Sequence, residues 1–190
     1  MDIKKEIQER GLILSNNVLK VNSFLNHQLD PNLLNEMANE WYLRYKDKGI
    51  TKIVTIEASG IALGILTGLK LNVPVVFAKK SNGSNMGECY QTLIHSYTKN
   101  KDYTVSIEKQ FLNKDDLILI IDDFLANGNA TLGLIDLINQ ANAKVIGIGI
   151  AIEKGFQHGG DILRNKGYDV YSLAIIDEMD PITKNIIFRS

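Results

Sequence analysis

The chain has 190 residues, of which 45% are hydrophobic and 23% are charged, and its formal net charge is −1. This composition is typical of a globular protein and excludes a disordered or fibrous chain. Because 21 basic residues are balanced by 22 acidic ones, the chain lacks the basic face that tracks a nucleic-acid backbone, and we expect no nucleic-acid partner. The single cysteine, Cys89, excludes an internal disulfide.

The length is that of one domain, so we expect residues 1–190 to form a single unit. Residues 1–10 are charged and lack the apolar stretch of a signal peptide. The longest apolar run, residues 145–152, contains Gly147 and Gly149 and is far too short to cross a bilayer. A cytoplasmic protein without a membrane partner is therefore expected.

The first clear helix is predicted after Asp30-Pro31, which reads as a helix cap followed by proline at the first helical position. Its apolar residues Met37, Trp41 and Tyr45 recur at helical spacing, and the pattern ends before Gly49. An amphipathic helix of this kind is expected to cover a sheet.

Short apolar runs rich in β-branched residues follow, at residues 52–56, 73–78, 117–121 and 144–152. Helical stretches separate them, most clearly at residues 61–70 and 131–142. Strands that alternate with helices predict right-handed crossovers. The expected fold class is therefore α/β, with a parallel sheet flanked by helices.

Residues 81–113 interrupt this alternation. Two polar, partly alternating segments, 88–97 and 103–109, flank a turn-like stretch at 98–102, a pattern that predicts an inserted β-hairpin. Such a hairpin would serve as a lid over a site, or would be a solvated excursion without a role. Both interpretations remain open at this point.

The strongest chemical signal follows the strand 117–121. Asp122-Asp123 comes first, and then Phe124-Leu125-Ala126-Asn127-Gly128-Asn129-Ala130, which contains several small residues, leads to a helix from Thr131. Two carboxylates at the carboxyl end of a parallel strand suit sugar hydroxyls or Mg²⁺, and a small-residue loop opening a helix presents backbone N–H groups to phosphate. Either half alone is an ordinary turn or cap, but their order predicts a site for a sugar phosphate.

This segment resembles the signature by which type I phosphoribosyltransferases bind 5-phosphoribosyl 1-diphosphate (PRPP). The likeness extends to residues 11–28, 54–60, 74–80 and 147–154, and it is strongest to the xanthine branch of that family. The commoner family loop has Thr-Gly-Gly-Thr where this chain has Asn127-Gly128-Asn129-Ala130, so backbone amides must do more of the phosphate binding here. The xanthine branch tolerates this pattern.

The resemblance implies transfer of the 5-phosphoribosyl group from PRPP to N9 of xanthine, giving xanthosine 5′-monophosphate and diphosphate in purine salvage. It also implies a homodimer and a Mg²⁺ ion that arrives with PRPP, with no direct metal ligand from the protein. Residues 11–30 are expected to contribute to a hood over the base, and residues 81–113 to form the lid.

Site residues follow from the same resemblance. Asp122 and Asp123 are expected to be the catalytic pair that holds the ribose hydroxyls. Expected PRPP contacts are Ala126, Asn127, Gly128, Asn129, Ala130, Lys80, Ala58, Ser59 and Gly60. From the residues alone, Glu57-Ala58-Ser59-Gly60 is equally a capped helix start, and lysine at a strand end commonly extends to water.

Four residues are expected to contact the base. The ammonium of Lys154 suits the exocyclic oxygen of an oxopurine and would meet the amino group of adenine donor to donor. Phe156 would stack on the base or lie in an ordinary core. The resemblance adds Leu19 and Asn26 from the hood, with the Asn26 amide reading the 2-oxo edge.

Two other functions remain open. A hypoxanthine or guanine phosphoribosyltransferase would share the 6-oxo contact with Lys154 and would differ at the 2-position. A regulator that senses PRPP while binding nucleic acid is disfavoured by the near-neutral charge and by the absence of a helix-turn-helix pattern.

Overall fold

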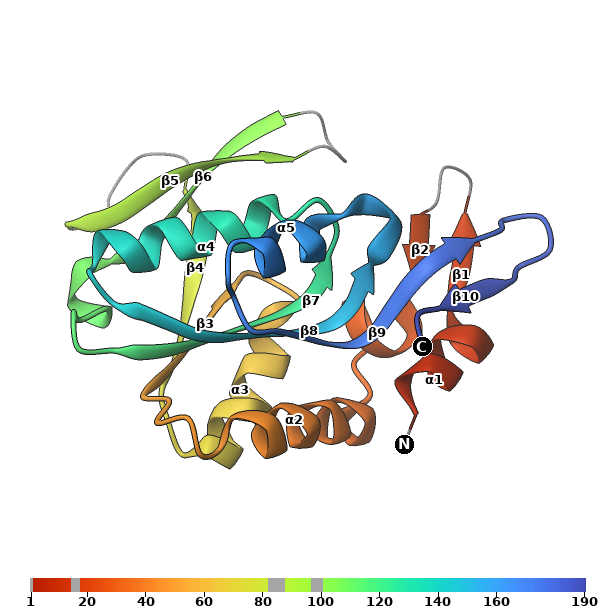
Figure 1. The fold of residues 1–190 in the computed structure, drawn as a ribbon, viewed down its shortest axis with the longest axis horizontal. Helices are drawn as coiled ribbons and strands as arrows, with labels where there is room; N and C mark the ends of the chain where they lie inside the picture. The colour runs from red at the N-terminus through yellow and green to blue at the C-terminus, as the bar shows by residue number, and fades with distance from the viewer. Residues whose placement is uncertain (1, 15–17, 82–87, 97–100) are drawn as a thin grey trace.

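The computed structural model describes residues 2–14, 18–81, 88–96 and 101–190 (Figure 1). Its main feature is an eight-stranded sheet in the order β10-β9-β8-β7-β3-β4-β6-β5. The five strands from β9 to β4 are parallel to one another, whereas β10, β6 and β5 pair antiparallel with their neighbours. The strands are β3 Lys52–Ile56, β4 Val75–Ser81, β5 Cys89–Ser96, β6 Lys101–Glu108, β7 Leu117–Leu125, β8 Lys144–Lys154, β9 Val170–Met179 and β10 Ile186–Phe188.

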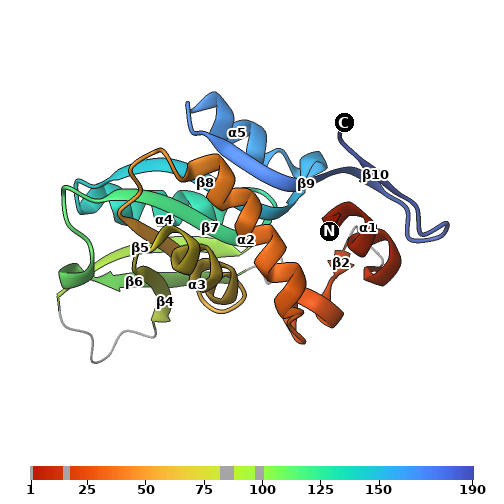
Figure 2. The same ribbon diagram turned by 90° about the horizontal axis from the view of Figure 1, so that it is seen from below.

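Helices cover both faces of this sheet. Figure 1 shows α4 (Asn129–Gln140) and α5 (Gly159–Asn165) above it, and α2 (Pro31–Tyr45) and α3 (Gly60–Leu71) below it. Figure 2 shows the sheet from below, with α2 and α3 in front. The fold class predicted from the alternation of strands and helices is confirmed.

Alternate residues of the central strands supply the two cores. In β7, Leu119 and Ile121 belong to the core under α2 and α3, whereas Ile118 and Ile120 belong to the core under α4. All four side chains are fully buried. A strand buried on both faces must be apolar on both, which explains the unbroken apolar run in the sequence.

Helix α2 begins where its sequence signal predicts. The Asp30 side chain accepts a hydrogen bond from Leu33 N, and Pro31 occupies the first turn. The apolar stripe that contains Trp41 and Tyr45 is buried against the sheet. The predicted helix is therefore confirmed.

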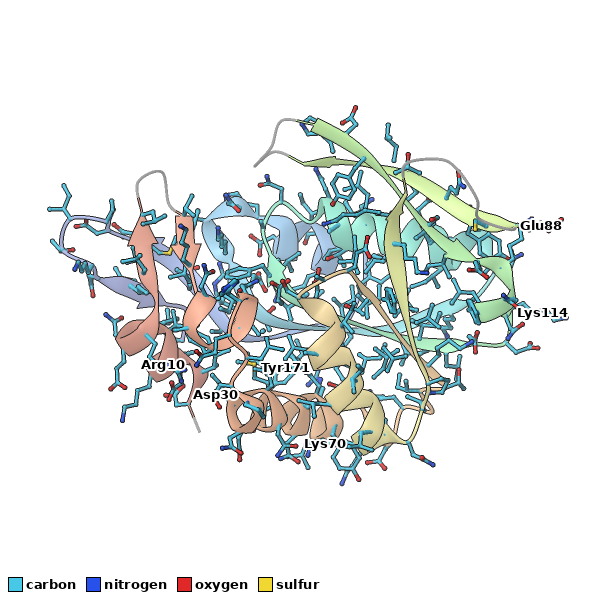
Figure 3. The ribbon with its side chains drawn as sticks, turned by 180° about the vertical axis from the view of Figure 1, so that it is seen from behind. Arg10, Asp30, Lys70, Glu88, Lys114 and Tyr171 are labelled. Carbon is cyan, nitrogen blue, oxygen red and sulfur yellow. The ribbon has the colours of Figure 1, made fainter. Side chains whose placement is uncertain are left out.

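The N-terminal segment forms α1 (Ile3–Arg10), the short strands β1 (Leu12–Leu14) and β2 (Val18–Lys20), and a π-helical turn, η2 (Asn22–Asn26). We call this segment, residues 2–14 and 18–26, the hood, although only residues 11–30 were expected to contribute to one. Arg10 attaches it to the start of α2, because its Nη1 lies 3.0 Å from Asp30 Oδ2 and its Nη2 donates to Ser23 O; Figure 3 shows Arg10 and Asp30 side by side. Buried Phe24 joins the same core as α2.

Several predicted boundaries were wrong, and neighbouring strands explain why. Strand β4 extends through Lys80 because β6 pairs with it there, and β7 extends to Leu125 because β8 pairs with it beyond Asp122. Asp122, Asp123 and Lys80 therefore lie within strands, not after them. Strand β8 ends at Lys154, two residues beyond its predicted end, and the strand β9 that follows was not predicted. Helix α4 begins at Asn129, two residues before its predicted start.

The predicted hairpin is present. Strands β5 and β6 pair antiparallel from Cys89↔Glu108 to Ser96↔Lys101, while residues 97–100, where most of the predicted turn falls, lie outside the described residues. The hairpin packs on α4, since a Cβ at Gly133 would lie 2.5 Å from Ile94 Cδ1. None of the described helices is long and apolar enough to span a membrane.

Candidate functional site

The acidic pair lies near the carboxyl end of β7, beside the ends of β3 and β4. Asp122 is only 3% exposed, and its Oδ1 accepts a hydrogen bond of 2.9 Å from Asp123 N. Burial raises the pKa of Asp122 well above its usual range, and the negative charge of Asp123 raises it further. Asp123 is partly exposed, so the two carboxyl groups differ in environment.

The hood reaches this acidic pair through Asn26. Its Nδ2 donates to Asp123 Oδ2 at 2.6 Å and to Ser59 Oγ at 3.1 Å. Asn26, which is expected to contact the base, therefore lies within hydrogen-bond distance of Asp123, expected to hold the ribose, and of Ser59, expected to contact PRPP. They come from the hood, β7 and the loop before α3.

The loop after β3 is held close to the sheet. A cis peptide bond joins Glu57 to Ala58, and Glu57 Oε1 accepts a hydrogen bond of 2.6 Å from Lys80 N on β4. Gly60 begins α3 with no room for a side chain, because its Cβ would lie 2.1 Å from Thr55 Oγ1 and 3.1 Å from Asp122 Oδ1. The exposed Ala58 and half-buried Ser59 thus lie next to the acidic pair.

Lys80 extends across the site. Its Nζ lies 5.3 Å from the ring centroid of Tyr103 on β6, and its positive charge partly offsets the rise in the pKa of Asp122. The side chain is exposed, as lysine at a strand end commonly is. It nevertheless places a cation between the hairpin and the acidic pair, which is a suitable position for binding a polyanion.

The loop from Ala126 to Gly128 turns sharply into α4. Gly128 has a φ of +85°, in the left-handed region that glycine favours. Gly159 N donates to Ala126 O at 3.0 Å, and a Cβ at Gly159 would lie 2.2 Å from that oxygen. The start of α5 therefore fixes the loop, whose backbone N–H groups lie at the positive end of the 12-residue α4.

A pocket of about 150 Å³ separates this loop from the hairpin. Asn129 spans the gap at one point, where its Nδ2 donates to His95 O at 2.9 Å. The pocket is lined by Ile94, His95, Tyr103, Phe124, Leu125, Ala126, Asn127, Gly128, Asn129, Ala130 and Thr131. The predicted PRPP contacts at residues 126–130 therefore all line this pocket.

The residues assigned to the base are less tightly grouped. Lys154 is half-buried at the end of β8, where burial lowers its pKa, and its Nζ lies 5.6 Å from the ring centroid of Phe124. Phe156 packs against the core under α2 and α3. Leu19 is only 6% exposed, so it offers little surface to a ligand.

Comparison with known proteins identifies the family of the chain. A model of the phosphoribosyl transferase domain matches residues 21–177. The chain belongs to the phosphoribosyltransferase family. The family predicted from the segment 117–131 is confirmed.

Two related phosphoribosyltransferases match almost the full length. A xanthine phosphoribosyltransferase from Clostridium novyi is 54% identical over 189 residues, covering 99% of this chain and 98% of the relative. A xanthine phosphoribosyltransferase from Bifidobacterium longum is 52% identical over 190 residues, with the same two coverages.

Solved phosphoribosyltransferase structures share the fold. The enzyme from Giardia lamblia complexed with 9-deazaadenine gives a TM-score of 0.76 at 24% identity, covering 92% of this chain and 97% of the other. The adenine phosphoribosyltransferase from Trypanosoma brucei gives 0.74 at 20% identity, covering 92% and 80%. At these identities the match concerns the fold alone.

Sequence reasoning missed three residues that shape this phosphoribosyltransferase site. Gly159 fixes the turn of residues 126–128, and Phe124 lies beneath the Lys154 ammonium. Glu153, which is 1% exposed, accepts two hydrogen bonds from Arg164, at 2.8 and 2.7 Å, and so fixes the end of β8 beside Lys154. A lone glutamate at the end of an apolar strand was the available signal for Glu153.

Metal-binding side chains are not grouped in the part of the chain that the structure describes. No cluster of three or more histidine, cysteine, aspartate or glutamate residues is placed there to hold a metal ion. Of the two carboxyl groups in the acidic pair, burial favours the neutral form of Asp122.

Proposed function

We propose that this phosphoribosyltransferase joins the 5-phosphoribosyl group of PRPP to N9 of xanthine, forming xanthosine 5′-monophosphate and diphosphate. The observation that carries the proposal is the meeting of Asn26, Asp123 and Ser59 within hydrogen-bond distance. A base, a ribose and a diphosphate must converge on one carbon atom in this reaction. The near full-length relatives named for xanthine support that base.

In this proposal the protein acts by positioning and by charge, with no covalent nucleophile. Asp122 and Asp123 hold the ribose hydroxyls, and the amides of residues 126–130 bind the 5′-phosphate. Lys80 and the loop 58–60 offset charge on the departing diphosphate. Mg²⁺ brought by PRPP would neutralise part of that charge.

Base selection is assigned to Lys154, Phe156, Leu19 and Asn26. The Lys154 ammonium donates to a 6-oxo group, which adenine lacks, while Asn26 reads the 2-oxo edge that distinguishes xanthine from hypoxanthine. A hypoxanthine or guanine phosphoribosyltransferase is the alternative, since the same lysine would serve those bases.

The deciding experiment is turnover by the purified protein with Mg²⁺ and PRPP, given xanthine, guanine, hypoxanthine or adenine in turn. Formation of nucleotide and diphosphate fastest with xanthine is expected. Preference for guanine or hypoxanthine would select the alternative, and no turnover with any base would reject the enzymatic function. Nucleic-acid binding at physiological salt in an inactive protein would instead favour a regulator.

We also propose that the protein works as a cytoplasmic homodimer. Ile65 and Leu69 lie one helical turn apart on α3 and are 54% and 76% exposed, so they offer an apolar face to a second copy. Sedimentation at micromolar concentration tests this. A monomer at all concentrations would contradict the proposed assembly.

A further inference from the structure

Tyr103 is a hairpin residue that faces residues 126–130, the loop proposed to bind the 5′-phosphate, which we call the phosphate loop. It lies opposite Ile94 in the β5–β6 register, and directly opposed residues project to the same face of a sheet. Ile94 packs against α4 at Gly133, so this face of the hairpin is the one turned toward the loop and α4. Both Tyr103 and Ile94 line the pocket in front of residues 126–131.

Two charged side chains act on Tyr103. Lys80 Nζ lies 5.3 Å from its centroid, within the range of an attractive cation–π contact. Burial raises the pKa of Tyr103, and the negative charge of Asp122 raises it further. The phenol therefore keeps its proton at neutral pH and stays a hydrogen-bond donor.

The loop itself supplies few side-chain hydrogen-bond donors. Its polar side chains are the amides of Asn127 and Asn129, and Asn129 already donates to His95 O. Thr131 also lines the pocket, but it is only 1% exposed. Among the described residues that line this pocket, Tyr103 is the partly exposed one that carries a hydroxyl.

We propose that Tyr103 contacts substrate: its hydroxyl donates a hydrogen bond to the sugar-phosphate half of PRPP, and its ring positions the Lys80 ammonium for the diphosphate. The inference rests on the proposed function and extends it from the sheet to the hairpin. It gives the inserted hairpin a direct part in substrate binding.

The two parts of the side chain separate by substitution. Tyr103→Phe removes the hydroxyl and keeps the ring, so the dissociation constants of PRPP and ribose 5-phosphate should rise about tenfold while that of diphosphate stays unchanged. Tyr103→Leu also removes the ring, so diphosphate binding should weaken as well, by about threefold, the size of an exposed cation–π contact. The KM for xanthine should stay unchanged in Tyr103→Phe.

The hairpin offers a matched control. Lys109 Nζ lies 5.9 Å from the ring centroid of Tyr90, so the same kind of pair occurs near the other end of the hairpin, outside the phosphate-loop pocket. Tyr90→Phe and Tyr90→Leu should leave all three dissociation constants unchanged. Equal weakening by the Tyr90 and Tyr103 variants would mean that hairpin packing alone is responsible, and would overturn the proposal.

Calorimetry on the full chain, with ribose 5-phosphate and diphosphate as separate probes, measures these constants. Wild-type protein that turns over PRPP, with Tyr103→Phe equal to it in ribose 5-phosphate binding, would overturn the role of Tyr103 and leave the proposed function intact. Wild-type protein without turnover would instead reject the proposed function. If Tyr103→Leu does not fold, the Phe variant still decides the role of the hydroxyl.

Discussion

The side-chain amide of Asn26 donates a 2.6 Å hydrogen bond to Oδ2 of Asp123, a residue 97 positions away in the sequence. In the proposed reaction these groups bind different substrates, since the amide reads xanthine and the carboxylate holds the ribose. When neither substrate is present, this hydrogen bond therefore pairs two groups that would each bind a substrate. PRPP must displace the amide before its hydroxyls reach Asp123.

Asn26→Ala should consequently have opposite effects on the two substrates. PRPP binding without base should tighten by about two- to fivefold, because part of a charge-assisted hydrogen bond no longer has to be broken. The KM for xanthine should rise by about tenfold, because the 2-oxo contact is lost. Calorimetry with PRPP and steady-state kinetics with xanthine measure the two effects.

Gln28→Ala, at an exposed position just after η2, serves as the control and should change neither value. If Asn26→Ala weakened PRPP binding and xanthine use together, the amide would be a structural support of the acidic pair and not its competitor.

Asp122→Asn should stabilise the free protein at neutral pH while it abolishes PRPP binding. Burial and the charge of Asp123 raise the pKa of Asp122, so the folded state binds a proton more tightly than the unfolded state. Stability from this group is then present at low pH and is lost as pH rises through the raised pKa. The side-chain amide of the asparagine variant does not ionise, so the variant keeps this stability at high pH. Its melting temperature at pH 8 should rise by a few degrees, since about 1 kcal/mol corresponds to 2–4 °C.

Thermal unfolding at pH 4 and pH 8 checks the sign of this effect. The gain from Asp122→Asn should shrink toward pH 4, where wild-type Asp122 is protonated, and Asp115→Asn at an exposed position should show no such trend. A variant less stable than wild type at both pH values would mean that ionised Asp122 is stabilised by partners in the fold.

Lys154→Ala should lower kcat/KM for xanthine, hypoxanthine and guanine alike, by about tenfold or more, and should leave the PRPP dissociation constant unchanged. Burial lowers the pKa of Lys154, so its ammonium is lost at a lower pH than that of an ordinary lysine. The kcat/KM for oxopurines should therefore fall as the pH rises, at a pH below the usual lysine pKa. Kinetics from pH 7 to 10 test this.

Lys144→Ala, at the exposed start of the same strand, is the matched control and should behave as wild type. Unchanged use of every base by Lys154→Ala would remove that residue from base recognition.

The sequence predicted the buried strands and capped helices because their signals are local. Strand β3 matches its predicted span, residues 52–56, and α2 begins at Pro31 as Asp30-Pro31 indicates. Strand β9 was missed because polar side chains interrupt its apolar residues, and much of it is only half-buried. Strands β1 and β2 and the π-helical turn of the hood were not predicted, since their sequences have no period and their structure depends on packing into the core.

The part of the site that lies near the ends of strands was predictable from the sequence. The acidic pair follows the apolar run of residues 117–121 within β7, and the loop follows that strand, so a pattern of residue types indicated both. Asn26 entered only through resemblance, because nothing local indicates that it lies against Asp123. Gly159 escaped for the same reason, since its partners Ala126 and Gly128 are far away in the sequence.

Gly159→Ala tests whether that remote glycine sets the shape of the phosphate loop. A Cβ there would lie 2.2 Å from Ala126 O and 2.6 Å from Gly128 N, and backbone atoms at such distances must move. The hydrogen bond from Gly159 N to Ala126 O should be lost or distorted. We expect a destabilisation of about 1–3 kcal/mol, typical of overpacking, and at least a tenfold weaker affinity for ribose 5-phosphate.

Binding of diphosphate should hardly change in Gly159→Ala, because Lys80 and the loop 58–60 belong to other elements. Asn165→Ala, at the exposed end of α5, controls for effects of that helix and should leave both ligands unaffected. Equal weakening of ribose 5-phosphate and diphosphate would mean that the substitution disturbs the whole sheet edge. Selective loss of ribose 5-phosphate would assign the 5′-phosphate to the loop that Gly159 holds in place.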